Sequence, residues 1–353
     1  NKVENKMHRG VVYALLAATL FGASTPFSKI LVGQMAPVML AGLLYLGSGL
    51  GLLAWYSLRF LISGGKKTSG DRLTKSDLPW LGGAILTGGI AGPVLLMIGL
   101  TLTPASSASL LLNIEGVLTA LLAWFVFKEN FDRRIFAGMI LIVMAGVLLS
   151  LGGDSKLEVP WGALAIVAAC LCWAIDNNLT RKVSASDAVQ IAGIKGLVAG
   201  SVNLSIALAL GYSIPDTPTI FSASVIGFCG YGLSLVMFVL ALRHLGTART
   251  GAYFSAAPFV GAVVSLLILG ETPNTVFWIA AALMGAGIWL HVTETHGHEH
   301  THLPLSHAHA HRHDAHHQHE HDFPWDGKEP HVHPHEHLSL IHISEPTRQA
   351  EIS

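Results

Sequence analysis

The feature that most constrains this chain is a series of ten apolar runs, each close to 20 residues long. An α-helix needs roughly 20 apolar residues to cross about 30 Å of hydrocarbon. Because lipid offers the backbone no hydrogen-bond partners, runs of this kind are helices and not isolated strands. The sequence therefore predicts an all-α polytopic membrane protein with ten transmembrane helices, at residues 11–31, 38–60, 79–100, 105–127, 133–151, 161–180, 188–210, 220–242, 247–269 and 274–292.

The basic residues between these runs predict the side of the membrane on which each loop lies. Cytoplasmic loops are enriched in Lys and Arg. Of the 21 basic residues, sixteen lie in loops between or before the spans, and fifteen of these share one side if the N-terminus is cytoplasmic. Only Lys156 falls on the other side. We therefore expect a multi-pass protein of the cell (inner) membrane, embedded in the lipid bilayer, with both termini in the cytoplasm.

The loops also indicate a duplication. The linker at 61–78 is basic, whereas its counterpart at 211–219 contains no Lys or Arg. Five spans per half is an odd number, so the second copy must be inverted in the membrane. Inverted repeats of this kind occur in many secondary transporters, with the substrate site near the midplane between the halves. We expect a cytoplasmic N-terminus at 1–9, a first five-helix repeat at 10–151 and a second at 152–292.

Three segments resemble a known transporter family. They read ALLAATLFGASTPFSK at 14–29, NIEGVLTALLAWFVFKE at 113–129 and AAPFVGAVVSLLILGE at 256–271. Across about residues 10–292 the chain is similar to EamA-type members of the drug/metabolite transporter superfamily. Each half of such proteins tends to carry E-P-x-x-x-A on its fourth span and to end that span in G-E. Here Gly116 stands at the first proline position and Ala257 at the second acidic position. The resemblance implies gradient-driven movement of small organic metabolites, often export.

Ionisable residues inside the spans are candidate functional residues, because charges are costly in hydrocarbon. Glu115 lies ten residues into the fourth span, about 15 Å deep and thus near the midplane. Burial there favours the neutral carboxyl, which can carry a proton. Ser109 and Asn113 lie near it in the sequence. Glu115 is either a substrate or coupling residue, or a hydrogen-bonded structural residue between helices.

Asp176 and Lys195 lie at similar depths on spans six and seven. An ion pair is the simplest way to carry both charges there. The pair is either structural or a gating or substrate contact. Asn177 adds polarity beside Asp176. Three aromatic residues fit either a cavity lining or core packing, namely Trp173, Tyr231 and Tyr253. Lys29, near the outer end of the first span, is expected to anchor that end at the interface.

Motifs of the common ATP-driven and hydrolytic classes are absent from the sequence. The run at 63–68 contains glycine and lysine but lacks the G-x-x-x-x-G-K-[ST] spacing of a phosphate loop. Neither H-E-x-x-H nor G-x-S-x-G occurs. We therefore expect a protein that is not an enzyme, requires no cofactor and has no nucleic-acid partner. Its expected partners are a small-molecule substrate and a proton or other coupling ion.

The segment at 293–337 is rich in histidine and holds sixteen of the chain's 20 histidines. It has few aliphatic residues, so we expect a disordered cytoplasmic tail. Its repeated H-x-H spacing suits chelation of a divalent metal, and imidazole does not discriminate among zinc, nickel, cobalt and copper. The candidate ligands are His296, His298, His300, His302, His307, His309, His311, His313, His316, His317, His319, His321, His331, His333, His335 and His337.

The last sixteen residues, at 338–353, resemble an in-frame translation of a sequencing-library adapter, and we expect them to be an artefact.

Three functions remain open for the rest of the chain. The first is a secondary transporter, an exporter of small metabolites with a metal-binding tail. The second is a metal-handling membrane protein for zinc, nickel or cobalt efflux or buffering, which requires metal ligands clustered in the spans. The third is a membrane scaffold or receptor. The oligomeric state is left open by the sequence.

Overall fold

The structure is a computed structural model that describes residues 2–62, 75–127, 133–151, 160–183, 188–245, 250, 253–292, 305–311 and 331–337. The chain divides into two units, Asn1–Glu294 and Thr295–Ser353, which are described separately. The first unit is helical, with α1 (Lys2–Val32), α2 (Pro37–Ile62), α3 (Leu78–Ala84), η1 (Ile85–Ala91), α4 (Gly92–Leu102), α5 (Ala105–Leu111), α6 (Ile114–Phe127), α7 (Arg133–Leu151), α8 (Trp161–Lys182), α9 (Ala188–Ala209), α10 (Thr217–Gly227), η2 (Phe228–Leu233), α11 (Ser234–Leu245), α13 (Ala257–Leu269) and α14 (Thr275–Val292).

Eight of the predicted spans are confirmed as helical stretches long and apolar enough to cross a membrane. They are His8–Val32, Pro37–Leu58, Leu78–Leu102, Ala105–Leu122, Arg133–Leu151, Trp161–Thr180, Val189–Ala209 and Thr217–Phe238. The last two predicted spans correspond to shorter apolar helices, Ala257–Leu269 and Thr275–Leu290, so the count of ten is not confirmed. The ninth predicted run is only partly covered, because 247–249 and 251–252 lie outside the described residues.

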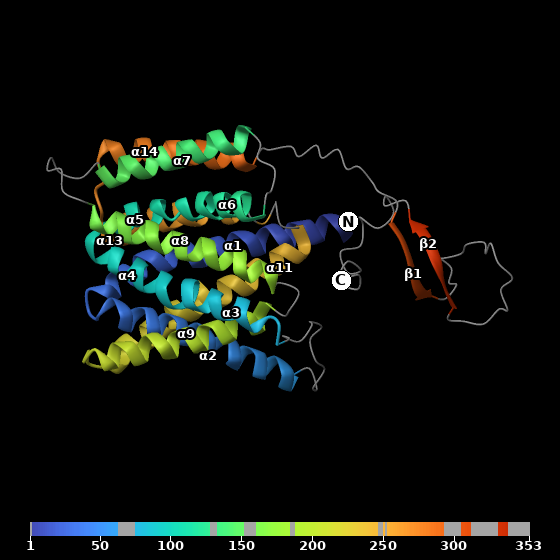
Figure 1. The fold of residues 1–353 in the computed structure, drawn as a ribbon. Coiled ribbons are helices and arrows are strands. Elements are labelled where there is room, and N and C mark those ends of the chain that lie inside the picture. Colours follow the sequence, from blue (N-terminus) through green and yellow to red (C-terminus); the bar gives the residue numbers. More distant parts are fainter. Residues whose placement is uncertain are drawn as a thin grey trace. The chain divides into compact units, whose positions relative to one another are not determined.

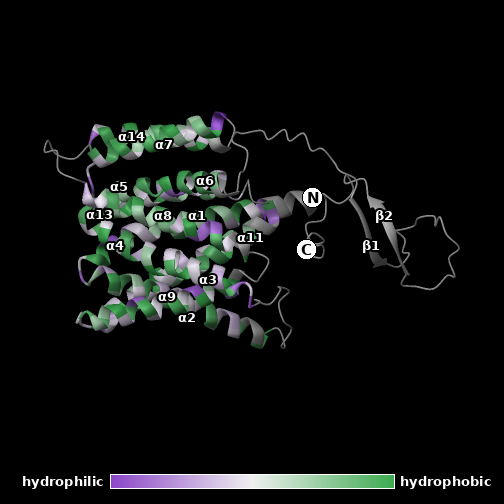
Figure 2. Cartoon of the chain, viewed as in Figure 1, coloured by the Kyte–Doolittle hydropathy of each residue, from purple (hydrophilic) through white to green (hydrophobic). Residues whose placement is uncertain are grey.

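The helices of this unit lie alongside one another in a bundle (Figure 1). Hydrophobic residues predominate along their lengths (Figure 2). Large apolar side chains such as Phe125, Leu267 and Trp289 are exposed on the bundle surface, whereas Ser109, Asn203 and other polar residues are buried inside it. This distribution suits a surface in contact with lipid and an interior that accommodates polar groups.

Corresponding helices of the two halves make corresponding contacts. Helix α1 packs on α11 and α13 of the second half, and α8 packs on α4 and α6 of the first. Helix α2 packs on α9, and α7 on α14. The π-helical segments η1 and η2 also correspond, because each lies in the third span of its half, at residues 85–91 and 228–233. The fold therefore repeats internally.

The two halves run in opposite directions through the bundle. The C-terminal end of α1 lies near Thr103, because Lys29 of α1 donates hydrogen bonds to the carbonyl oxygens of Leu100 and Thr103. Helix α8 begins at the same place, because a Cβ atom on Gly162 would lie 2.3 Å from Thr103 Oγ1. We call this the Thr103 end of the bundle. The loop charges predict that it faces the outside of the cell.

Three of the spans are irregular near their middles. The third and eighth contain the π-helical segments η1 and η2, a type of distortion that is frequent at functional sites. Segment η1 leads directly into Pro93, which has no N–H to donate to the preceding turn. The fourth span breaks between α5 and α6, at a turn formed by Leu112 and Asn113. Such breaks leave backbone groups free for other partners.

In the second unit the structure has two strands, β1 (Leu305–His311) and β2 (His331–His337), in a segment that we expected to be disordered. They pair antiparallel, with His307, His309 and His311 opposite His335, His333 and His331. The predicted all-α architecture applies to the first unit, and the disorder of the remainder of the tail stays a prediction. The H-x-H pattern has the two-residue period of a strand, which places alternate histidines on one face. The other predicted ligands, and residues 338–353, lie outside the described residues.

Candidate functional site

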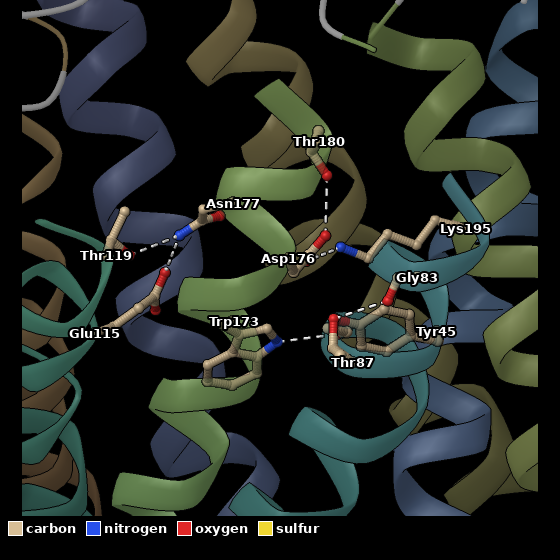
Figure 3. Close-up of polar contacts among 11 residues, drawn as sticks. Tyr45, Gly83, Thr87, Glu115, Thr119, Trp173, Asp176, Asn177, Thr180 and Lys195 are labelled. Atoms are coloured by element: carbon tan, nitrogen blue, oxygen red, sulfur yellow. Dashed lines mark hydrogen bonds and ion pairs between the residues drawn. The ribbon is translucent and has the colours of Figure 1, made fainter. Parts of the chain in front are cut away.

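Glu115 occupies the first turn of α6, immediately after the break in the fourth span. A carboxylate at a helix N-terminus is stabilised by the helix dipole. Its side chain reaches the second half of the protein, where Asn177 Nδ2 of α8 donates a hydrogen bond of 2.9 Å to Glu115 Oε1 (Figure 3). The same Asn177 amide lies 3.4 Å from Thr119 Oγ1. Glu115 thus links the first half to the second through one amide.

Asp176 and Lys195 form an ion pair between α8 and α9. The other carboxylate oxygen, Asp176 Oδ1, accepts a hydrogen bond of 2.9 Å from Thr180 Oγ1. Asp176 is 4% exposed, and the Lys195 side chain is 18% exposed. The predicted pairing is therefore present, and its functional role stays a prediction. Helix α8 places Asn177 towards Glu115 and Asp176 towards Lys195, so the two polar groups lie on either side of it (Figure 3).

The backbone of η1 supports this site through the carbonyl of Gly88. Trp173 Nε1 of α8 donates a hydrogen bond of 2.9 Å to Gly88 O, and the Tyr45 hydroxyl of α2 donates one of 2.8 Å to the same oxygen. Glycine is required at position 88, since a Cβ atom there would lie 1.9 Å from Asp176 Oδ2. Trp173 therefore has a defined polar contact beside the pair.

Four other residues were predicted to belong to the site: Ser109, Asn113, Tyr231 and Tyr253. Ser109 and Asn113 are buried on the Thr103 side of Glu115, where Ser109 Oγ donates to Ala105 O (2.8 Å) and Asn113 Nδ2 to Leu110 O (3.0 Å). Tyr231 lies in η2 with its ring 5.4 Å from that of Tyr45, between centroids. Tyr253, by contrast, is 38% exposed.

Sequence reasoning missed Tyr45, Gly88 and Thr180 as parts of this site. Tyr45 lies in an apolar run where a tyrosine has many packing roles, and nothing in the sequence pairs it with span three. Gly88 has a counterpart in the second half, Gly230, which also lies in a π-helical segment. Thr180 lies four residues after Asp176, a spacing that places both on one helix face. That spacing could have identified it.

Among the described residues, no group of three or more His, Cys, Asp or Glu is placed to hold a metal ion. Instead, Glu115 accepts a hydrogen bond from the Asn177 amide, and Asp176 pairs with the Lys195 ammonium group. Glu115 offers a carboxyl group that can gain or lose a proton. Asp176 and Lys195 offer two opposite charges, each of which could bind a group of a polar substrate.

A helical bundle that crosses the membrane repeatedly, with buried charges contributed by both halves, belongs to the class of polytopic membrane transporters. The EamA-like transporter family matches residues 8–151 and again residues 160–293. The chain belongs to this family.

Known proteins similar to the chain are transporters by name. An "Uncharacterized transporter" of Methanothermobacter thermautotrophicus is 28% identical over 295 residues, which cover 80% of this chain and 85% of that protein. A "Probable amino-acid metabolite efflux pump" of Salmonella typhimurium is 26% identical and covers 79% of this chain and 93% of its own length. A crystal structure with 18% identity and a TM-score of 0.58, covering 79% of this chain and 95% of its own, shares the fold.

Proposed function

We propose that the protein is a secondary, gradient-driven transporter that exports small organic metabolites. The observation that carries the proposal is the contact between Glu115, at a break in the fourth span, and Asn177 of the opposite half. In secondary transporters, discontinuous helices near the midplane bind substrate and coupling ions. A group that contacts both halves at such a break can respond when the halves move relative to one another.

Glu115 is the proposed coupling residue. A charged carboxyl is costly to move through a low-dielectric interior, whereas the protonated form is much less so. Protonation from one side and release to the other would therefore link reorientation of the halves to the proton gradient. Asn177 can donate to Glu115 Oε1 in either protonation state, so the contact is compatible with both steps.

The proposed substrates carry both positive and negative groups. Asp176 and Lys195 offer one partner for each sign of charge, and Lys195 retains partial exposure. The similar protein of Salmonella typhimurium is named "Probable amino-acid metabolite efflux pump", and free amino acids carry an ammonium and a carboxylate group. Trp173 and Tyr231 are proposed as the aromatic part of the same site. Tyr253 stays a weaker candidate because of its exposure.

The membrane arrangement that we propose has ten spans in two inverted repeats, with both termini cytoplasmic. Two observations support it: the short helices α13 and α14 are apolar throughout, and the two halves make matching contacts in opposite directions. The histidine-rich tail is proposed to chelate a divalent metal on the cytoplasmic side, as the H-x-H spacing suggests.

The experiment that tests the proposed function is transport by the purified protein in reconstituted vesicles. Uptake of a panel of labelled amino acids and their derivatives is measured with and without an imposed pH gradient. We expect at least one zwitterionic compound to accumulate only when the gradient is present. A panel in which no compound moves, together with intact, monodisperse protein, would contradict export of amino-acid-like metabolites.

A further inference from the structure

The corner between spans three and four is held by two oppositely charged side chains from other parts of the bundle. Lys29 of α1 donates to the carbonyl oxygens of Leu100 and Thr103, the latter at 3.0 Å, at the end of α4. Glu271 follows α13, and its two carboxylate oxygens accept hydrogen bonds from the N–H groups of Ala105 (2.7 Å) and Ser106 (2.9 Å), at the start of α5.

Each charge has the sign that its helix end favours. The last carbonyls of a helix carry partial negative charge and the first N–H groups partial positive charge, and neither has a partner within the helix. Hydrogen bonds to a carboxylate are roughly twice as strong as neutral ones. Gly270, at φ +64°, ends α13 in the left-handed conformation and turns the chain so that Glu271 reaches α5.

The Glu271 contact joins the two halves, because Glu271 belongs to the second and Ala105 and Ser106 to the first. Beneath it, α5 lies directly against α13, since a Cβ atom on Gly261 would lie 2.7 Å from Ser109 Oγ. Two buried polar residues on α5, Ser106 and Ser109, lie between this contact and Asn113, which precedes Glu115. Glu115 lies nine positions after Ser106, which corresponds to roughly 13 Å at the helical rise per residue.

A pocket of about 360 Å³ lies beside Glu271 at the Thr103 end. Its lining includes Thr103, Ser106 and Glu271. The pocket reaches Ser106 but not Ser109, Asn113 or Glu115. The contact between α5 and α13 therefore separates the pocket from the polar residues deeper in the bundle.

We infer that Glu271 is a latch that closes the Thr103 end of the transport path. In the structure described here the latch is shut. When the carboxylate releases the N–H groups of Ala105 and Ser106, α5 can move away from α13, and the polar face from Ser106 to Glu115 becomes continuous with the pocket. This inference rests on the proposed transport function, but its test uses access to the path and requires no substrate.

The test measures how fast a membrane-impermeant thiol reagent labels a single cysteine at Ser109→Cys. Cys170, Cys172 and Cys229 are first replaced by alanine, since these are the native cysteines. Labelling is compared in intact cells and in inside-out vesicles, so that each face is sampled. Glu271→Gln keeps the size of the side chain but removes its charge. Ala105→Pro removes one of the two N–H donors instead, at a helix position that tolerates proline.

We expect both variants to raise the labelling rate about tenfold, and only from the side that the Thr103 end faces. Tenfold corresponds to weakening the closed state by about 1.4 kcal/mol. Asp216→Asn is the matched control, because Asp216 precedes α10 at the same end without a side-chain capping bond, and its labelling should equal that of the parent. Unchanged labelling in both variants, or an equal rise from both faces, would overturn the latch. If neither the Glu271→Gln nor the Ala105→Pro variant folds, Glu271 is a structural cap of α5, and the latch is likewise overturned.

Discussion

Replacing Asp176 with asparagine removes the carboxylate partner of Lys195 and leaves a buried ammonium group unpaired. Breaking a buried ion pair on one side costs about 3–5 kcal/mol. The Lys195 side chain is 18% exposed, so some solvation remains and the lower value, about 3 kcal/mol, applies. Asparagine has nearly the shape of aspartate and fits against Gly88, so little of this loss comes from repacking. Its amide oxygen can still accept from Thr180.

Lys195→Met should cost a similar amount, because it leaves Asp176 with only the Thr180 hydroxyl among the side-chain contacts described here. Two independent losses would sum to about 6 kcal/mol. In the double variant neither charge is present. We therefore expect its loss of unfolding free energy to be smaller than that sum by about 2–3 kcal/mol, within the range of coupling energies for residues in contact.

The assay is reversible unfolding of the four proteins in mixed detergent micelles, followed by circular dichroism as the fraction of denaturing detergent rises. Asp216→Asn serves as the control, and its free energy of unfolding should change by no more than about 0.5 kcal/mol. If the double variant equals the sum of the two single variants, Asp176 and Lys195 do not interact in the folded protein, and the geometry described here is wrong.

Three further predictions test other parts of the structure. Gly88→Ala should destabilise the protein by about 1–3 kcal/mol in the same unfolding assay, because its Cβ would collide with Asp176 Oδ2, whereas Gly82→Ala, with nothing within 4 Å, should not. Deletion of residues 296–337 should abolish most zinc or nickel binding measured by calorimetry, and equal binding without the tail would place the ligands elsewhere. A cysteine in the 61–78 linker should react with an impermeant reagent only after the cells are permeabilised, and one in the 211–219 loop should react in intact cells; the reverse pattern would refute the predicted orientation.

Most of the helical fold could be predicted because span length depends on composition alone. The eight confirmed spans agree with the predicted ranges to within a few residues, and the largest difference is at the end of the fourth span, which stops at Leu122 and not at 127. The π-helical segments were not predicted, although glycine pairs mark both of them, Gly88 and Gly89 in the first and Gly230 and Gly232 in the second. The pairing of β1 with β2 could not be predicted, because the H-x-H period fits an extended segment but does not specify a partner strand.

The candidate site was only partly predictable from the sequence. Asp176 and Lys195 could be paired because adjacent spans that share a short loop must lie near one another at that end. The contact between Glu115 and Asn177 depends on how α6 and α8 are rotated about their axes, and the sequence of either helix alone does not specify that rotation. Glu271 was visible as part of a G-E pattern, but its two N–H partners lie 165 and 166 positions earlier in the chain. Only the fold brings them together.

The central claim is that Glu115 couples transport to a proton gradient, and the most direct test is the Glu115→Gln variant in reconstituted vesicles. Glutamine keeps the hydrogen-bonding shape next to Asn177 but cannot release a proton. With a transported compound identified in wild-type protein, the initial rate is measured across a range of pH gradients, with Asp216→Asn as the control. We predict a folded variant that still binds and exchanges substrate across the membrane but no longer accumulates it in response to the gradient. Accumulation at the wild-type rate with the same dependence on the gradient would contradict the account.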